Sequence, residues 1–413
     1  MSQGPDPLAE TGVAERPAPG GVLPAAGRLG SIDAYRGLVM FLMMAEVLHF
    51  CQVSRALPGS AAWKFLCHHQ SHVEWTGCVL HDLIQPSFSF LVGVALPFSL
   101  ASRMARGQSV GLMTAHAAWR SLILVFLGVF LRSVGRPQTN FTFEDTLSQI
   151  GLGYTFLFLL GLRSVRVQVL ALAAILLGYW GLFAAYPLPG QDFSYPAVGV
   201  PADWPHLLGG FPAHWNKNSN PAWSFDVWFL NLFPRREPFR FNGGGYATLS
   251  FIPTLATMIL GLLAGGLLKR PARPWPRVLA LVGLGLLGLG AGWGLEALGV
   301  CPVVKRIWTP SWVLYSGGLC FLFLAFFHAV IDVLGLKAWA FPLMVIGANS
   351  IAAYCGSHLL EHFVSESIKT HLGRHVFESF GQAYAPFVEG VAVLLVFWLI
   401  LFWMYRRKLY IRI

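Results

Sequence analysis

Long runs of apolar residues alternate with short polar segments along most of this chain. Several runs of roughly 20 residues carry almost no charge, for example 249–268 (LSFIPTLATMILGLLAGGLL) and 391–405. A run of this length can cross a hydrocarbon layer of about 30 Å as a helix. Because the runs are continuously apolar and backbone groups in lipid must pair internally, we expect helices and not barrel strands.

The pattern therefore predicts an all-α, polytopic membrane protein. Of the 413 residues, 55% are hydrophobic and 12% are charged, about half of what soluble domains carry. An ordinary soluble enzyme is excluded. Ten transmembrane helices are expected, at 35–52, 79–101, 119–135, 147–163, 167–186, 248–268, 278–298, 311–332, 339–360 and 386–405.

The chain divides into two parts. Residues 1–27 are rich in Pro, Gly and Ala and lack the basic start and apolar stretch of a signal peptide. They are expected to be a disordered cytoplasmic tail. Residues 28–413 would form the membrane domain, with its longest outer loop at 187–246. Loops longer than about 15 residues tend to be functional.

The net charge of +10 is explained by topology. With a cytoplasmic N-terminus, 17 of the 29 Lys and Arg residues lie on the inner side and most acids on the outer side. The positive-inside rule then favours both termini in the cytoplasm, and no nucleic-acid partner is implied. Some inner cations would also suit the phosphates of a cytoplasmic cosubstrate, although topology alone accounts for them. They are Arg103, Arg106, Arg163, Arg166, Lys269 and Arg270.

Titratable residues are densest at the predicted outer end of the second span. Within 67–94 stand His68, His69, His72, Glu74, His81 and Asp82. Their spacing lacks a zinc pattern, so no metal site is expected. An imidazole held by a carboxylate could instead perform acid–base chemistry or carry an acyl group. Asp82 enters the span, where an acid is costly and usually functional, although helix N-terminal capping explains it too. Glu46 is a second intramembrane acid.

The outer loop 187–246 is dense in Trp, Pro, Asn and Phe. HWNKNSNPAW (214–223) and FRFNGGGYATL (239–249) place Asn216 and Asn242 beside aromatic residues. Such residues suit a sugar, whereas an interfacial aromatic belt explains the aromatics alone. Gly243–Gly245 is expected to be a tight turn.

Three of the six cysteines, Cys51, Cys67 and Cys78, cluster near the first outer loop. Their spacing leaves open whether two of them form a disulfide.

Four spaced segments carry a resemblance to a known family. RLGSIDAYRGLVMFLMM (28–44) has the pattern R-x-x-S-x-D-x-x-R-G, and HVEWTGCVLHDLIQPSFSFLVGVAL (72–96) has H-x-x-W-x-G-x-x-x-x-D-L-x-x-P-x-F-x-F-x-x-G. KRIWTPSWVLYSGG (305–318) and VIDVLGLKAWAFPLMVIGANSIAAY (330–354) follow in the same order. Together these segments resemble the heparan-alpha-glucosaminide N-acetyltransferase family and its bacterial relatives.

The resemblance implies a catalytic histidine on the outer side, which maps onto His72. It further implies that acetyl-CoA is used from the cytoplasmic side, with an amino sugar or glycan as the outer acceptor. A homodimer and a bacterial inner (cytoplasmic) membrane location are also implied. Asp82 and Glu74 are then candidates to orient His72, and Trp75 to pack the site. Further candidates for substrate contact are Glu46, Asn216, Asn242, Trp312, Asn349 and Ser350.

Several alternatives stay open. Interhelical hydrogen bonding would explain Asn349 and Ser350 equally well. The family's Asn near the outer end of the first span is replaced by Glu46 or Val47, and Gln149 stands where the family has an Arg. Either change leaves room for a catalytically inactive member. A small-molecule permease is the other alternative, although no internal repeat is apparent.

Overall fold

The computed structural model describes residues 29–411, and these form helices joined by mostly short connections. Within this range the only β-pairing is one isolated bridge, between Thr76 and Val304. The tail predicted for residues 1–27 lies outside the described residues.

Eight helices in the described part of the chain are long and apolar enough to cross a membrane. They confirm an all-α, polytopic membrane protein. Each of these eight candidate spans is built on one long α-helix. In chain order these are α1 (Gly30–Met44), α4 (Ile84–Ala105), α5 (Val110–Ser133), α7 (Val165–Ala184), α9 (Phe251–Lys269), α10 (Pro274–Ala297), α11 (Pro310–Phe327) and α14 (Ala385–Arg406).

The two remaining predicted spans take other forms. Span 339–360 is broken into α12 (Phe341–Ala348) and α13 (Ser350–Leu372), which are bent by 70° and would make a ninth crossing if counted as one. Span 147–163 corresponds to α6 (Thr146–Gly161), which has 16 residues. The number ten and the side of each terminus stay predictions.

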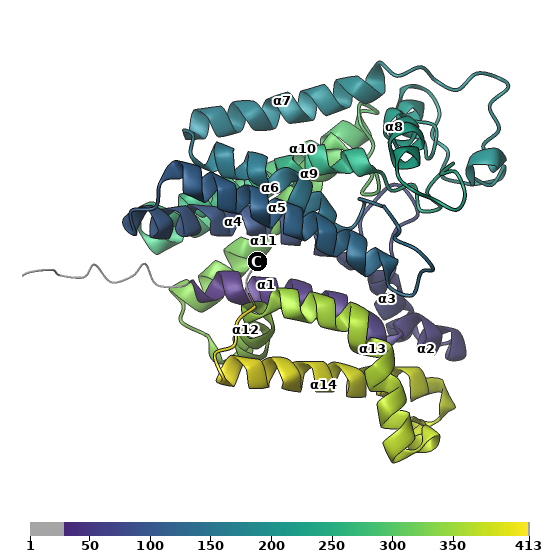
Figure 1. The fold of residues 1–413 in the computed structure, drawn as a ribbon, viewed down its shortest axis with the longest axis vertical. Coiled ribbons are helices and arrows are strands. Elements are labelled where there is room, and N and C mark those ends of the chain that lie inside the picture. Colours follow the sequence, from purple (N-terminus) through teal and green to yellow (C-terminus); the bar gives the residue numbers. More distant parts are fainter. Residues whose placement is uncertain (1–28, 412–413) are drawn as a thin grey trace, which may run out of the picture.

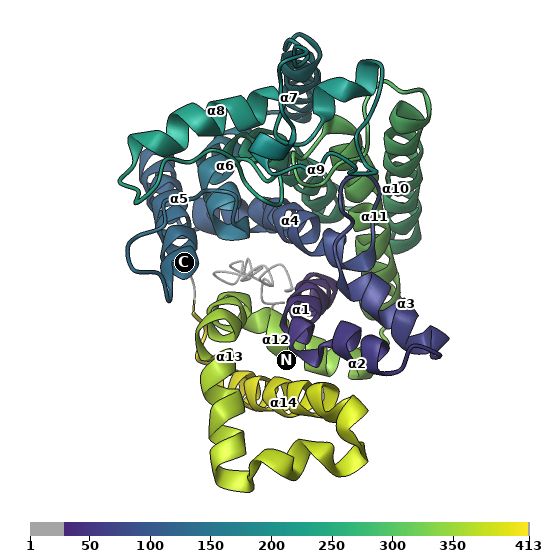
Figure 2. The same cartoon turned by 90° about the vertical axis from the view of Figure 1, so that its right-hand side faces the viewer.

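The helices form two groups. In Figure 1, α4–α7 and α9–α11 make the upper group, while α1 and α12–α14 lie below it, and Figure 2 shows the same division after a 90° turn. Within the upper group α4 and α9 nearly touch, because a Cβ on Gly93 would stand only 1.9 Å from the carbonyl oxygen of Met258. The close approach fixes the position of α4 against α9.

The first span does not continue as one helix to its outer end. After Met44 the chain makes a 3-10 turn over Ala45–Leu48, and His49 then adopts a left-handed conformation (φ 48°) before α2 (Phe50–Ala56). A carbonyl of this turn, that of Val47, packs against Gly390 of α14, where a Cβ would stand 1.9 Å away. Glu46 is therefore displayed from a turn and not from a helix.

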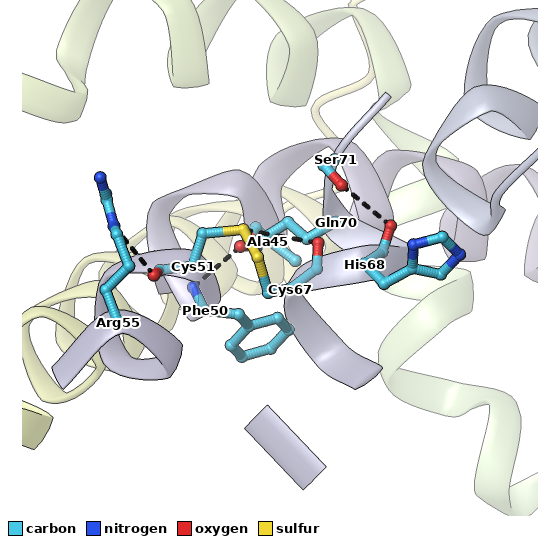
Figure 3. The surroundings of a disulfide bond; sticks show 8 residues. All are labelled: Ala45, Phe50, Cys51, Arg55, Cys67, His68, Gln70 and Ser71. Carbon is cyan, nitrogen blue, oxygen red and sulfur yellow. Dashed lines mark hydrogen bonds between the residues drawn. A yellow bond between two sulfur atoms is a disulfide. The ribbon is translucent and has the colours of Figure 1, made fainter. Parts of the chain in front are cut away.

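A disulfide and a glutamine hold this break against α3 (Ala61–Gln70), as Figure 3 shows. Cys51 is bonded to Cys67. The Gln70 side chain donates to the Ala45 carbonyl at 2.6 Å and accepts from the Phe50 N–H at 2.8 Å. The pairing that the sequence left open is thus Cys51–Cys67, while Cys78 is free.

A second break, between α12 and α13, is stabilised by Asn349. This residue is fully buried, donates from Nδ2 to the Leu409 carbonyl at 3.0 Å and accepts the Ile411 N–H on Oδ1 at 3.1 Å. Ser350 begins α13 directly after it. Both polar ends of the Asn349 amide are therefore used to close the bend against residues 409–411.

The long segment 187–246 contains α8 (Pro221–Phe229) and several 3-10 turns. It lies at the same end of the molecule as α2 and α3, on the right of Figure 1. Asp226 of α8 accepts the Thr248 N–H at 2.9 Å, at the turn that leads into α9. This contact ties the segment to the membrane helices.

Candidate active site

His72 lies in an extended segment between two helical elements. Helix α3 ends at Gln70, and the chain becomes helical again in the 3-10 turn Leu80–Leu83, which continues into α4. Asp82 occupies this turn, and its Oδ2 accepts the N–H groups of Val79 at 3.2 Å and Val73 at 3.4 Å. The carboxylate thus satisfies the Val79 N–H left free at the helix start, as an N-terminal acid does, and in addition the more distant Val73 N–H. The same contacts fold the His72 segment back over Asp82.

His72 and Asp82 form a direct hydrogen bond. Nδ1 of His72 lies 2.7 Å from Oδ1 of Asp82, whose side chain is fully buried, while the imidazole is 37% exposed. With Nδ1–H donating to the carboxylate, Nε2 carries the free lone pair. The arrangement is a carboxylate-oriented imidazole with one nitrogen available for a proton.

Lys305 is the third member of this cluster. Its Nζ lies 3.2 Å from Asp82 Oδ1 and 3.1 Å from His72 Nδ1, and the side chain is almost completely buried. Burial lowers the pKa of Lys305, and the charge of Asp82 opposes that effect. Asp82 therefore compensates a buried ammonium and orients a histidine at the same time.

The pKa of His72 is lowered from its usual value. Burial is the largest cause and the positive charge of Lys305 adds to it, whereas the hydrogen bond to Asp82 works in the opposite direction. A lowered pKa keeps the imidazole neutral at neutral pH. In that state Nε2 can accept a proton.

The loop before α11 positions Lys305. The Gly77 N–H donates to the Val303 carbonyl at 3.0 Å, and Arg306 donates to the carbonyls of Val73 (3.1 Å) and Gly244 (2.7 Å). This loop therefore joins the His72 segment to the 242–246 turn, although the three are far apart in sequence.

A cavity of about 640 Å³ opens beside His72. Its walls come from the outer end of α1, the start of α4, the end of α5, the start of α6, the 242–246 turn and the middle of α13. The polar lining residues are Glu46, His72, His81, Gln85, Arg132, Glu144, Asp145, Thr146, Asn242, Tyr246, Lys305, Tyr354, Ser357, His358 and Glu361. The cavity lies between the two helix groups.

Three of the residues expected from the sequence line this cavity: His72, Glu46 and Asn242. Asn242 uses its Oδ1 to accept the N–H groups of Gly244 at 2.8 Å and Tyr246 at 3.3 Å, so it shapes the glycine turn. Gln149, at the position that departs from the family pattern, is buried and donates to the Phe143 carbonyl at 2.8 Å.

Other expected residues lie outside the cavity lining. Glu74 accepts from the Trp204 indole at 3.0 Å and stands 3.5 Å from His206, so its carboxylate faces away from the His72–Asp82 pair. Trp75 is buried and donates to the Trp215 carbonyl. Trp312 is buried in the core beside Trp308. The Asn216 side chain hydrogen bonds to the backbone of Leu208, whose N–H it accepts on Oδ1 and to whose carbonyl it donates from Nδ2. Asn349 and Ser350 lie at the α12–α13 break.

The six cations that the sequence places on the inner side stand at the other ends of the helices. None of them lines the cavity, to which α4 contributes Ile84 and Gln85 of its first turn, while Arg103 lies in its last turn. Arg103 stands eighteen helical positions after Gln85, roughly 27 Å at 1.5 Å per residue. The cavity and these cations therefore lie about one membrane thickness apart, and the described cavity does not join them.

Sequence reasoning missed three residues on the side of the cavity formed by α5, α6 and α13. Arg132 of α5 pairs with Asp145 at 3.3 Å, and Tyr354 of α13 donates to the same carboxylate at 3.0 Å. It also missed Lys305, and it singled out His81 only as one member of the titratable group within 67–94. Lys305 did leave a signal, because a Lys–Arg pair at 305–306 on the predicted outer side opposes the positive-inside bias.

Among residues 29–411 no group of three or more His, Cys, Asp or Glu side chains could hold a metal ion. The expectation of a reaction without metal stays a prediction.

The helices and this cavity define a polytopic membrane protein with a histidine–carboxylate pair at one end of its helices. Two curated proteins are similar to this chain, and both are named heparan-alpha-glucosaminide N-acetyltransferase. The human protein is 24% identical over 420 residues, covering 87% of this chain and 59% of the relative. The mouse protein is 23% identical over 444 residues, covering 94% and 61%. The resemblance stated from the motifs is thereby confirmed as a family-level relationship.

This chain spans about three-fifths of the length of either relative. No protein-family model matches it. The names of the two relatives support an acetyltransferase interpretation in general.

Proposed function

We propose that this protein is a multi-pass acetyltransferase that moves an acetyl group from acetyl-CoA, supplied at the cytoplasmic face, to an amino sugar or glycan outside the membrane. The bacterial inner membrane is its proposed location, and a homodimer its proposed assembly. Acetyl-CoA would supply an acetyl thioester, and the six inner cations are the candidates to hold its phosphates.

One observation carries the proposal: the 2.7 Å hydrogen bond between His72 Nδ1 and Asp82 at the wall of a polar cavity. His72 Nε2 would take a proton from the acceptor nitrogen as that nitrogen becomes bonded to the acetyl carbon. Asp82 would hold the tautomer and stabilise the imidazolium that forms. Lys305 would keep His72 neutral before the reaction. Lys305 would also stabilise negative charge on the acetyl oxygen, if that oxygen comes within reach.

Two features support the direction of transfer. The inner cations lie at the helix ends opposite the cavity, as a cytoplasmic face requires under the positive-inside rule. The Cys51–Cys67 disulfide lies at the cavity end, and disulfides persist in oxidising compartments outside the cytoplasm. Both features favour binding of the acceptor on the side of the membrane where His72 lies.

Acetyl transfer tests the proposal. Purified protein in detergent is given labelled acetyl-CoA and glucosamine-bearing acceptors, beside its His72→Ala and Asp82→Asn variants. His72→Ala should lower transfer by about 10²- to 10⁴-fold, the usual contribution of a general base. His68→Ala is the matched control, since this exposed histidine lies four positions away on α3 and outside the cavity lining.

Equal transfer by wild type and His72→Ala would remove His72 from the mechanism. No transfer by folded wild type, together with solute uptake into vesicles, would favour the permease. No activity of either kind would favour an inactive member of the family.

A further inference from the structure

A second imidazole–carboxylate pair lines the same cavity. Nε2 of His81 lies 3.0 Å from Oε1 of Glu46. His81 is only 7% exposed, whereas the Glu46 side chain is 60% exposed, so the carboxylate faces the cavity and the imidazole supports it from behind. The two residues come from 3-10 turns, one after α1 and one before α4, which the fold brings together.

The two pairs are in contact. The rings of His72 and His81 have their centroids 4.6 Å apart with an angle of 51° between their planes. Two imidazolium charges at this separation repel each other, so the pair favours a single positive charge. Asp82 shares its charge with Lys305, whereas Glu46 faces His81 with no lysine or arginine in a described ion pair with it. One ring is therefore bonded to a carboxylate that a lysine also contacts, and the other to a carboxylate that is open to the cavity.

The chemistry of amine acetylation calls for two proton acceptors. A basic amine reaches the site as R–NH₃⁺, and it must lose one proton before its nitrogen can attack the acetyl carbon. After the N–C bond forms, the nitrogen loses a second proton as the C–S bond breaks and the thiolate leaves. One proton ends on the thiol and the other goes to water. A hydroxyl acceptor, by contrast, loses one proton only.

Resting on the proposed function, we infer that Glu46 and His81 receive the acceptor as an ammonium and take its first proton, while His72 takes the second. The ammonium is bound by the exposed carboxylate of Glu46, which is held by Nε2–H of His81 at 3.0 Å, and that carboxylate takes the proton.

The charge of the cavity agrees with a cationic guest. Although the whole chain is +10, the described lining holds four carboxylates (Glu46, Glu144, Asp145, Glu361) against two permanent cations (Arg132, Lys305). Arg132 is paired with Asp145, and Lys305 with the buried Asp82. His358 and Glu361 of α13 line the same cavity as Glu46, and both interact electrostatically with its carboxylate. An ammonium that enters the cavity therefore meets a lining on which negative charge is in excess.

The test varies the basicity of the acceptor in the full-length protein. Wild type, Glu46→Gln and His81→Asn are compared on glucosamine, which is largely an ammonium at pH 6.5, and on an alkoxyamine, whose nitrogen is already neutral. On glucosamine we expect both variants to lose about 10²-fold in kcat/KM. On the alkoxyamine the loss should shrink to less than about threefold. Raising the pH above the ammonium pKa of glucosamine should restore much of the loss.

A binding measurement without donor gives a second readout. Glucosamine should raise the melting temperature of wild type, and Glu46→Gln should abolish that rise. Glu237→Gln, the same change at an exposed position of the outer segment, should leave both rate and binding as in wild type. Variants that melt as wild type does without ligand exclude misfolding as the cause.

The outcomes separate this inference from the function it rests on. Wild-type transfer that needs His72 but is reduced equally on both acceptors by Glu46→Gln overturns the inference alone. An unreduced rate on glucosamine overturns it as well. No wild-type transfer to either acceptor defeats the proposed function itself.

Discussion

Asp82 stabilises a buried lysine, Lys305, directly beside a neutral histidine, His72. At the residue scale it is the central group of the site, because it contacts His72, Lys305 and two backbone N–H groups. Removing one member of a buried ion pair leaves the other uncompensated, which typically costs about 3–5 kcal/mol. The stability and the chemistry of the site therefore depend on the same carboxylate.

Asp82→Asn should lower the stability of the protein by about 3–5 kcal/mol, because Lys305 loses its counter-charge. Adding Lys305→Met should recover most of the stability and none of the acetyl transfer. Thermal unfolding in detergent, followed by transfer assays on the same samples, checks both statements. A double variant no more stable than Asp82→Asn would mean that the lysine charge is not the cause.

The pH dependence of transfer follows from the lowered pKa of His72. A general base works in its deprotonated form, so kcat/KM should fall only when the pH drops below the ordinary histidine value of about 6.5. Lys305→Met removes a positive charge that disfavours the imidazolium, so its acid limb should move to higher pH. A weakly basic acceptor keeps ionisation of the substrate out of the profile. An acid limb that stays in place would show that Lys305 does not act on His72.

Two of the three residues of the central cluster, His72 and Asp82, could be predicted from sequence. His72 and Asp82 are ten positions apart in one segment, and the family resemblance singled out the histidine. Lys305 is 233 positions from His72, and its contact depends on the Thr76–Val304 bridge. Glu74, two positions from His72, was a reasonable second candidate, but the extended backbone turns its side chain toward Trp204. Local spacing cannot resolve such a choice when the segment is not helical.

At the scale of elements, the length of the apolar runs predicted where helices form. It did not predict the breaks after Met44 and at Asn349. The turn after Met44 depends on Gly390 admitting the Val47 carbonyl, and the bend at Asn349 depends on residues 409–411. These partners are hundreds of positions away for one break and about sixty for the other. The two breaks matter because they set Glu46 and the α13 wall of the cavity.

The Cys51–Cys67 disulfide stabilises the first break. It closes a loop of 16 residues, which corresponds to about 3 kcal/mol in the chain-entropy account. Cys51→Ser should lower the melting temperature, and a reductant should destabilise wild type but not this variant. Cys355→Ser, at a free cysteine of α13, is the matched control and should behave as wild type. A wild-type protein insensitive to reductant would mean that the bond is absent in the membrane.

At the scale of the whole molecule, the cavity end and the basic end define an orientation. A cysteine at Gly59, in the open turn between α2 and α3, should react with a membrane-impermeant maleimide on intact cells. A cysteine at Ser164, exposed between α6 and α7, should react only after permeabilisation. Both are made in a background whose free cysteines are serine. The reverse pattern would invert the topology and, with it, the direction of acetyl transfer.

Asn349 also imposes an order on how the molecule is completed. Its buried amide has its partners in Leu409 and Ile411, about sixty residues later, so during synthesis the bend cannot close until those residues have left the ribosome. Helix α13, which carries Tyr354, His358 and Glu361, takes its final position only after the bend has closed. The wall of the cavity facing His72 is consequently assembled last, and a partly made chain has His72 in place before the cavity beside it is complete.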